Sequence, residues 1–304
     1  MKKHLPLVVA LACAGTASVN AIEMTDEERI FLSAVRPVIP AVSGVAWEVH
    51  ESRGFESGGG TADWQIIEVS APIGFTTFGS RRAAVAFGLD YSFVDLSTSQ
   101  GGVDFGADLH SLFLSATGVY RPEGSKWFYG GQIAPGLRTD FDSIGRDDFA
   151  FRSFVGAGRQ VSDTFGWGYG AYVSMDADGY FFAPGVAFAW APSEKWMVGL
   201  IPPQLGVSYQ PSDGWLISLA VLPRSYSANL GSDSGIADYA SVSYLRTALS
   251  VRRKISERPG IWLSAAVGGT FFGDVDVKRD DRRLFDSEID PGLYGRIGLE
   301  IISW

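Results

Sequence analysis

Phe165-Gly166-Trp167-Gly168-Tyr169-Gly170-Ala171-Tyr172-Val173-Ser174-Met175 is the segment with the clearest strand pattern in this chain. Its odd-numbered residues are all apolar, and its even-numbered residues are small or polar apart from Tyr172. Successive side chains of a β-strand point to opposite faces, so this strand has one greasy, aromatic face and one face of small residues. Repeated along an exported chain, such a pattern predicts a closed β-barrel in a membrane.

The first 21 residues have the features of a cleaved secretory signal peptide. Lys2 and Lys3 supply the positive start, Leu5 to Ala14 form a short apolar core, and Val19-Asn20-Ala21 places small residues where a signal peptidase cuts. We therefore expect cleavage after Ala21. The alternative, lipidation of Cys13, is disfavoured because a lipobox has leucine three residues before the cysteine, where this chain has alanine.

Cleavage changes the composition of the mature chain. Cys13, the one cysteine, leaves with the leader, so no disulfide is expected. Loss of Lys2 and Lys3 moves the formal net charge from −9 to −11, which disfavours nucleic acid as a partner. His50 and His110 are the two histidines left, too few for a histidine-rich metal site, and no cofactor is predicted.

From Ala41 onward the strand rhythm continues, with turn residues between the apolar runs. Hydrophobic residues make up 46% of the chain, yet no run of 18 follows the leader, so no helical membrane span is expected. We predict an all-β fold, an antiparallel transmembrane barrel of about 12 strands, with about 10 to 14 allowed, because bacterial barrels use even numbers. The predicted organisation is signal peptide 1–21, N-terminal segment 22–40 and barrel 41–304.

A short helix is predicted in the N-terminal segment. Thr25 and Glu28 form a capping box, Arg29 to Val35 continue the helix, and Pro37 and Pro40 end it. Three placements stay open for this helix: beneath the barrel, inside the lumen as a plug, or frayed in the periplasm.

A soluble β-sandwich also alternates apolar and polar residues, so it is the main alternative fold. Three features disfavour it. Several strands carry glycine and alanine on the second face instead of solvent-facing lysine or glutamate, aromatic residues gather near strand ends as in membrane girdles, and the chain ends in a strand.

The last residues carry a family resemblance. Arg296, Gly298, Ile301 and Trp304 resemble the closing strand by which bacterial outer-membrane barrels are recognised for assembly, although Ser303 stands where a hydrophobic residue is usual. Across Ala41 to Trp304 the chain is similar to outer-membrane β-barrel families of unknown function; Tyr129-Gly130-Gly131, Pro135-Gly136 and Trp196 to Pro203 have that character. The resemblance implies the bacterial outer membrane as location, with lipid, lipopolysaccharide and the barrel assembly machinery as partners, and carries no active site.

Charged residues on the small or polar faces of strands are expected to line the lumen, because charge on the lipid face is costly. The candidates are Glu68, Asp90, Arg152, Arg246, Arg252, Arg296 and Glu300. In a narrow barrel such charges pair and fill the interior, whereas in a pore they set ion selectivity. The hypotheses are thus a narrow channel or transport barrel for small solutes, or a non-conducting structural or surface-interaction barrel.

An outer-membrane hydrolase is the third and weakest hypothesis. Asp108 and His110 have the Asp-x-His spacing of outer-membrane proteases, but Asp176 and Asp178 follow them instead of preceding them. A Ser-His pair fails because His110 and Ser111 face opposite sides of a strand. No catalytic residue and no metal ligand is therefore assigned, although two loops rich in aspartate, around residues 140–148 and 274–290, leave divalent-ion binding open.

Overall fold

A computed structural model shows the fold. It describes residues 42–56, 58–78, 82–100, 103–142, 144–176, 179–201, 204–230, 237–257, 260–279 and 282–302. The predicted signal peptide, the predicted N-terminal helix and the cleavage site near Ala21 lie outside these residues, as does Trp304. Within them, no helix is long and apolar enough to cross a membrane.

The described chain forms one antiparallel sheet that closes on itself. Its strands are β1 (Val42–His50), β2 (Arg53–Gly54), β3 (Gly60–Phe78), β4 (Ala83–Gln100), β5 (Val103–Tyr120), β6 (Trp127–Thr139), β7 (Phe149–Gln160), β8 (Phe165–Asp176), β9 (Gly179–Ser193), β10 (Trp196–Ile201), β11 (Gln204–Ser212), β12 (Trp215–Asn229), β13 (Tyr239–Ser256), β14 (Gly260–Arg279), β15 (Arg282–Ile289) and β16 (Gly292–Ile302). A 3₁₀ turn, η1 (Arg146–Asp148), precedes β7.

Fourteen of these sixteen strands make the closed ring. Each pairs with its neighbour in chain order, and β1 closes the ring by pairing with β16 on one side and β3 on the other. The two-residue β2 pairs with β3, and β15 pairs with the far end of β14, so both lie outside the ring. All-β antiparallel architecture is thus confirmed.

The preferred number of about twelve strands is not confirmed, since the ring has fourteen, the upper end of the predicted range of about 10 to 14. The sequence shows twelve or thirteen candidate runs, and the even-number rule favoured twelve, whereas the structure adds β11. β11 was missed because it is short and follows Pro202-Pro203, which reads as an end of pairing. It forms a hairpin with β10 from Trp196↔Tyr209 to Ile201↔Gln204.

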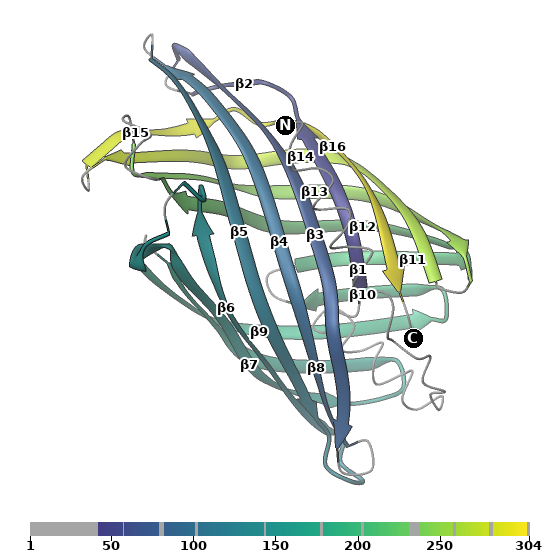
Figure 1. The fold of residues 1–304 in the computed structure, drawn as a ribbon. Coiled ribbons are helices and arrows are strands. Elements are labelled where there is room, and N and C mark those ends of the chain that lie inside the picture. Colours follow the sequence, from purple (N-terminus) through teal and green to yellow (C-terminus); the bar gives the residue numbers. More distant parts are fainter. Residues whose placement is uncertain are drawn as a thin grey trace.

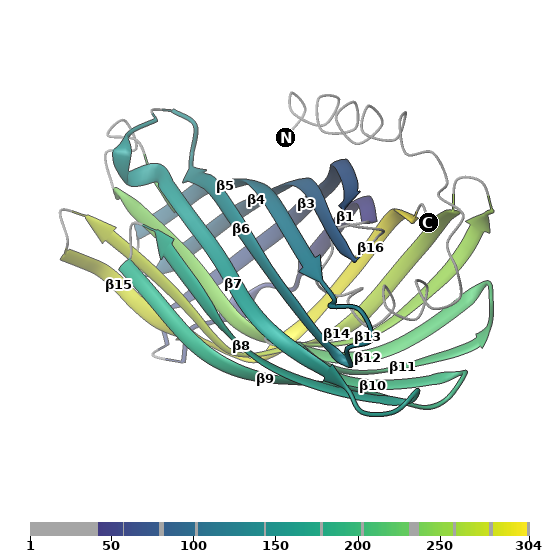
Figure 2. The ribbon, with the colours of Figure 1, turned by 90° about the horizontal axis from the view of Figure 1, so that it is seen from below.

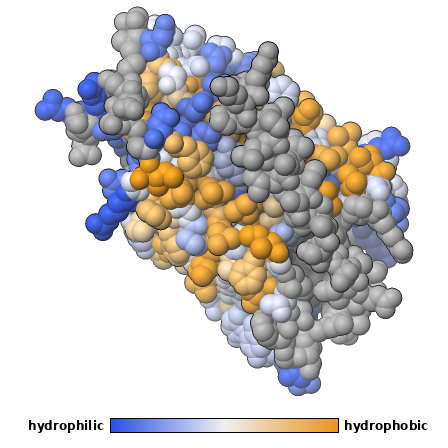
Figure 3. All heavy atoms as spheres, viewed as in Figure 1, coloured by the Kyte–Doolittle hydropathy of each residue, from blue (hydrophilic) through white to orange (hydrophobic). Residues whose placement is uncertain are grey.

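Large apolar side chains cover the outside of the ring. Trp167, Tyr169 and Met175 of β8 are 37%, 54% and 51% exposed, and Val155 and Val186 on its neighbours are exposed as well. An apolar surface of this extent is unfavourable in water but suits lipid. Figure 3 shows hydrophobic side chains in a band across one face, with hydrophilic residues gathered at the end where β15 lies.

The two ends of the barrel differ. At the end where β1 begins and β16 finishes, short turns join the strands; we call it the turn end. At the opposite, loop end, Asn229 of β12 pairs with Thr139 of β6, so the ring bypasses β7 to β11 there. Figure 1 shows β3, β4 and β5 rising steeply across β7 to β11, and Figure 2 shows β6 to β10 sweeping around the interior.

The long strands continue past the length that a membrane requires. β3, β4, β5, β13 and β14 have 18 to 20 residues, against about 9 to 11 needed for a tilted membrane strand. Their loop-end halves enclose a dry core that includes Ile66, Leu96, Val242 and Val275, all buried. The barrel is therefore narrow and packed at the loop end and wide at the turn end.

Candidate functional site: the barrel interior

A network of opposite charges lies inside the barrel below the dry core. Glu48 of β1 pairs with Arg246 of β13 and lies 3.3 Å from Arg296 of β16. Glu68 of β3 lies 2.5 Å from the same Arg296 and 3.4 Å from Arg224 of β12. Two carboxylates and three guanidinium groups from five strands thus meet, and each charge has an opposite partner.

Tyrosine hydroxyls complete this network. Tyr226 donates to Glu68 at 3.0 Å, and Tyr244 donates to Glu48 at 3.2 Å. These bonds join β12 to β3 and β13 to β1, strands that are not neighbours in the ring. Such cross-barrel bonds fix the walls against one another and fill the middle of the interior with polar groups.

His50 links the network to the dry core. Its Nε2 lies 2.8 Å from a Glu48 oxygen, and its ring stacks on Trp64 at 4.5 Å between centroids. The Arg53 guanidinium group also lies over the Trp64 ring, 4.7 Å from its centroid, and Arg53 contacts Thr270 of β14. Contacts with other polar groups or with aromatic faces offset part of the cost of burial here, although Arg53 Nε and Trp64 Nε1 have no hydrogen-bond partner among the described residues.

The structure brings three of the seven predicted lining residues, Glu68, Arg246 and Arg296, into this network. The other four lie elsewhere. Arg252 and Glu300 pair at 3.2 Å near the turn end, Asp90 accepts a bond of 2.8 Å from Ser70, and Arg152 lies 3.9 Å from the Phe113 ring. The seven thus form separate local pairs as well as one shared cluster.

Sequence reasoning missed Glu48, Arg224, Tyr226 and Tyr244. Glu48 carried a usable signal, because it alternates with Val45, Trp47 and Val49 and so belongs to the inner face of its strand. Arg224 and Tyr226 follow Pro223, a residue that is unusual inside a strand, so they carried no comparable signal.

The glycines on the inner face of β8 allow a close contact with the neighbouring strand β7. A Cβ placed on Gly170 would lie 2.5 Å from the Val155 carbonyl oxygen, and one on Gly168 would lie 2.8 Å from that of Ala157. Both oxygens belong to β7, so these glycines let β7 and β8 approach closely where the wall bends. Gly298 of the predicted assembly signal is also constrained, with Ser264 Oγ only 2.7 Å from its virtual Cβ.

The candidate catalytic residues do not form a site. His110 has the outward parity of Leu112 and Leu114, yet it is buried on that face: its Nδ1 lies 2.7 Å from the Tyr91 hydroxyl, and Phe141 packs on its ring. The partner of Asp176 is Arg138 of β6. Asp178 lies outside the described residues.

The acidic loops mostly bond to themselves. Asp140 and Asp148 accept the backbone N–H groups of Asp142 and Gly145, which is ordinary loop capping. Among the described residues, no group of three or more His, Cys, Asp or Glu side chains is placed to hold a metal ion.

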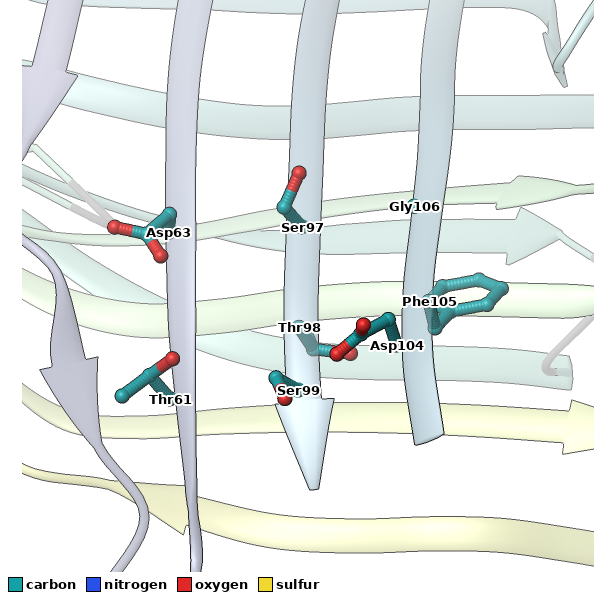
Figure 4. Close-up of a pocket in the computed structure, with 8 residues that line it drawn as sticks. All are labelled: Thr61, Asp63, Ser97, Thr98, Ser99, Asp104, Phe105 and Gly106. Carbon is teal, nitrogen blue, oxygen red and sulfur yellow. The ribbon is translucent and has the colours of Figure 1, made fainter. Parts of the chain in front are cut away.

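A shallow cavity of about 320 Å³ lies on the outer face of β3, β4 and β5 near the loop end. Figure 4 shows its lining, where Asp63, Ser97 and Asp104 come from three adjacent strands. Two carboxylates and several hydroxyls make this an acidic, hydrophilic surface above the apolar belt. It holds no grouping of nucleophile and base that would indicate catalysis.

Comparison with known families gives one match over most of the barrel. Residues 51–301 match the family described as Domain of unknown function (DUF6268). The chain belongs to this family. Membership agrees with the resemblance to outer-membrane β-barrel families of unknown function. No curated protein matches the chain.

Solved structures similar to this DUF6268 member are membrane barrels. The TodX monoaromatic hydrocarbon channel deltaS2 mutant aligns with a TM-score of 0.45 and 9% identity, covering 86% of this chain and 89% of that one. An outer membrane channel from Pseudomonas putida F1 aligns with a TM-score of 0.44 and 10% identity over 86% and 94%. The KdgM porin aligns with a TM-score of 0.32 and 11% identity over 85% and 98%. At these values the likeness stops at general architecture.

Proposed function

We propose that this protein is a narrow transport barrel for small solutes in the bacterial outer membrane. The observation that carries the proposal is the uneven distribution of charge inside a closed ring. The ion network occupies the walls made by β1, β3, β12, β13 and β16, while the inner faces of β7, β8 and β9 present small residues, among them Gly168, Gly170 and Gly185. These glycines carry no side chain, so this wall leaves room for a solute among the described residues.

Conductance of the refolded mature chain in a planar bilayer tests the proposal. Steady unit currents are expected, and silence at all voltages would contradict it. Arg252→Glu is the matching variant, because Arg252 is partly exposed near the turn end, where it pairs with Glu300. It should shift selectivity towards cations, whereas Arg253→Glu, on the opposite face of β13, serves as the outward control.

A non-conducting structural barrel is the second candidate. The dry core at the loop end favours it, since Leu96, Val275 and their neighbours leave no exposed surface there. Refolded protein that inserts in membranes but passes neither ions nor sugars would support this candidate.

Location and partners belong to the same proposal. The apolar belt supports a place in the outer membrane, where lipid and lipopolysaccharide would contact it. Recognition of Arg296, Gly298, Ile301 and Trp304 by the assembly machinery is proposed from the sequence. Because Arg296 is also bound to Glu48 and Glu68, its replacement would disturb the interior as well as the signal.

A further inference from the structure

The wall of the barrel has a gap in its hydrogen-bonded ladder between β9 and β12. β10 pairs with β9 only up to Leu200↔Phe188, so Gly179–Ala187 of β9 have no strand on that side in the described chain. β11 pairs with β12 only up to Leu205↔Val221. The next residues of β12, Leu222–Ser225, likewise have no described partner strand there, although both β9 and β12 keep complete ladders on their other sides.

The gap is closed towards the loop end, so it is a window in the wall. Arg138 of β6 binds Asp176 at the end of β8 and donates to Ser227 of β12 at 2.6 Å. Asn229 of β12 pairs with Thr139 and donates to the Asp147 carbonyl oxygen at 2.5 Å. We call this opening the side window, bounded by β9, the β10–β11 hairpin, β12 and the Arg138 contacts.

Prolines lie on both edges of the window, so the sequence itself limits strand pairing there. Pro184 pairs with Ala171 of β8, and Pro223 pairs with Leu245 of β13, in ladders that continue without a shift. Because proline has no N–H, it fits there only with its nitrogen turned to the other side, which is the window. Pro202-Pro203 stand between β10 and β11. Proline at these edges prevents further pairing and removes donors that hydrocarbon would leave unsatisfied.

The window lies at membrane depth. The outward residues of β9 run from Tyr180 to Trp190 and are apolar, with aromatic residues at both ends. Ten residues at about 3.3 Å each, tilted by about 45°, rise about 23 Å, close to the apolar band of about 25 Å in such barrels. From Ala187 to Gly179, the part nearer the loop end, β9 has no described partner strand on its β10 side. The window therefore opens into the part of the bilayer nearer the loop end.

The inner wall beside the window is aromatic. Tyr172 of β8 and Phe181 of β9 lie on the small-residue faces of their strands, with ring centroids 6.3 Å apart. They are 36% and 57% exposed, so these rings are not covered by the packed core. Across the window, Arg224 on the β12 edge turns inward to Glu68. The aromatic rings of β8 and β9 thus face the β12 edge, which carries Arg224 and backbone carbonyl groups with no described partner strand on that side.

We propose that small apolar solutes with one polar end pass sideways through this window, between the wide lumen and the membrane. The proposal rests on the transport function proposed above and adds the route and the class of solute. The aromatic rings take the apolar body of the solute, and the unpaired carbonyl groups and Arg224 take its polar end.

Lipid contact at the window can be measured without any transport. The mature chain has no cysteine, so a bimane label on Ala183→Cys is unique; Ala183 is on the inner face of β9 at the window. Brominated lipid chains should quench this label as they quench one on the outward Val155→Cys, and should not quench a label on the inner Gln132→Cys of β6. A label on Ala183→Cys that is no more quenched than that on Gln132→Cys would overturn the window.

Solute entry tests the route. Cells carrying the full chain should take up N-phenyl-1-naphthylamine, and Ala183→Trp should reduce uptake to the level of cells without the protein. The control, Val155→Trp, places the same side chain on the lipid side and should leave uptake unchanged. Uptake by Ala183→Trp equal to that of the parent would overturn the side route, while sugar flux into proteoliposomes would still show a transport barrel. Absence of both fluxes would overturn the transport function itself.

Discussion

The dry core at the loop end and the wide interior at the turn end differ in how the inside of the barrel is filled. At the loop end, seven strands (β3, β4, β5, β12, β13, β14 and β15) supply a dry core that includes Trp64, Leu96 and Val277. At the turn end, fourteen strands enclose a larger interior, which β7 to β9 line with glycine and alanine. Strand number alone therefore does not determine whether a barrel is open, because the ring changes size along its axis.

The boundary between these regions is the ion network, and breaking it should have the largest effect. Glu48→Gln leaves Arg246 without its buried partner, which costs about 3–5 kcal/mol of unfolding free energy when one side of a buried pair is removed. Urea titration of the refolded protein in lipid vesicles measures this. Glu300→Gln is the control, because the partly exposed pair with Arg252 should contribute about 0–1 kcal/mol. Equal losses in both variants would show that the network is not desolvated.

The dry core predicts the next largest effect. Leu96 is fully buried, so Leu96→Ala should cost about 2–5 kcal/mol, the range for a buried leucine whose removal leaves a cavity. Leu219→Ala on the lipid side of β12 is the matched variant, and it should cost less because lipid chains fill the space. The same titration compares them. A smaller loss for Leu96→Ala than for Leu219→Ala would mean that the loop end is not packed.

The tight contact between β7 and β8 gives a smaller prediction at the wide end. Gly170→Ala puts a Cβ against the Val155 carbonyl oxygen, so overpacking should cost about 1–3 kcal/mol. Gly118→Ala on β5 is the control, since its nearest neighbour would be 4.0 Å away. Refolding yield and urea midpoint report the difference. If Gly170→Ala were as stable as Gly118→Ala, the glycines would serve only to leave space.

Much of the barrel could be predicted from the sequence, since alternation in Phe165–Met175 and its counterparts follows directly from strand geometry. The narrowing could not, because it depends on Asn229 meeting Thr139, two residues 90 positions apart that no local pattern connects. The same holds for the dry core. Val275 and Ile66 look like ordinary apolar strand residues until the ring contracts around them.

The candidate site could be predicted in part, because alternation along a strand assigns each side chain to one face. Parity assigned Glu68, Arg246 and Arg296 to one side of their strands, and the structure brings them together. Their pairing with Glu48 and Arg224 depends on how the walls face one another, which parity does not specify. Pro184 is awkward in a central strand because proline cannot donate to a ladder; the structure shows that β9 has no described partner strand on one side there, so Pro184 stands on an edge.

The smallest effect is expected in the β14–β15 hairpin at the loop end, beyond the membrane belt. Burial, reinforced by Asp286 and Asp276, raises the pKa of Asp274 to about 6. Because the folded hairpin holds this proton more tightly than the unfolded chain, its stability should fall as the pH rises from about 4 to about 6. Amide exchange of Val275 and Val277 should therefore quicken, after correction for intrinsic exchange, over that interval. Asp274→Asn should remove the dependence, and a parent hairpin with constant protection across this interval would show that Asp274 ionises normally.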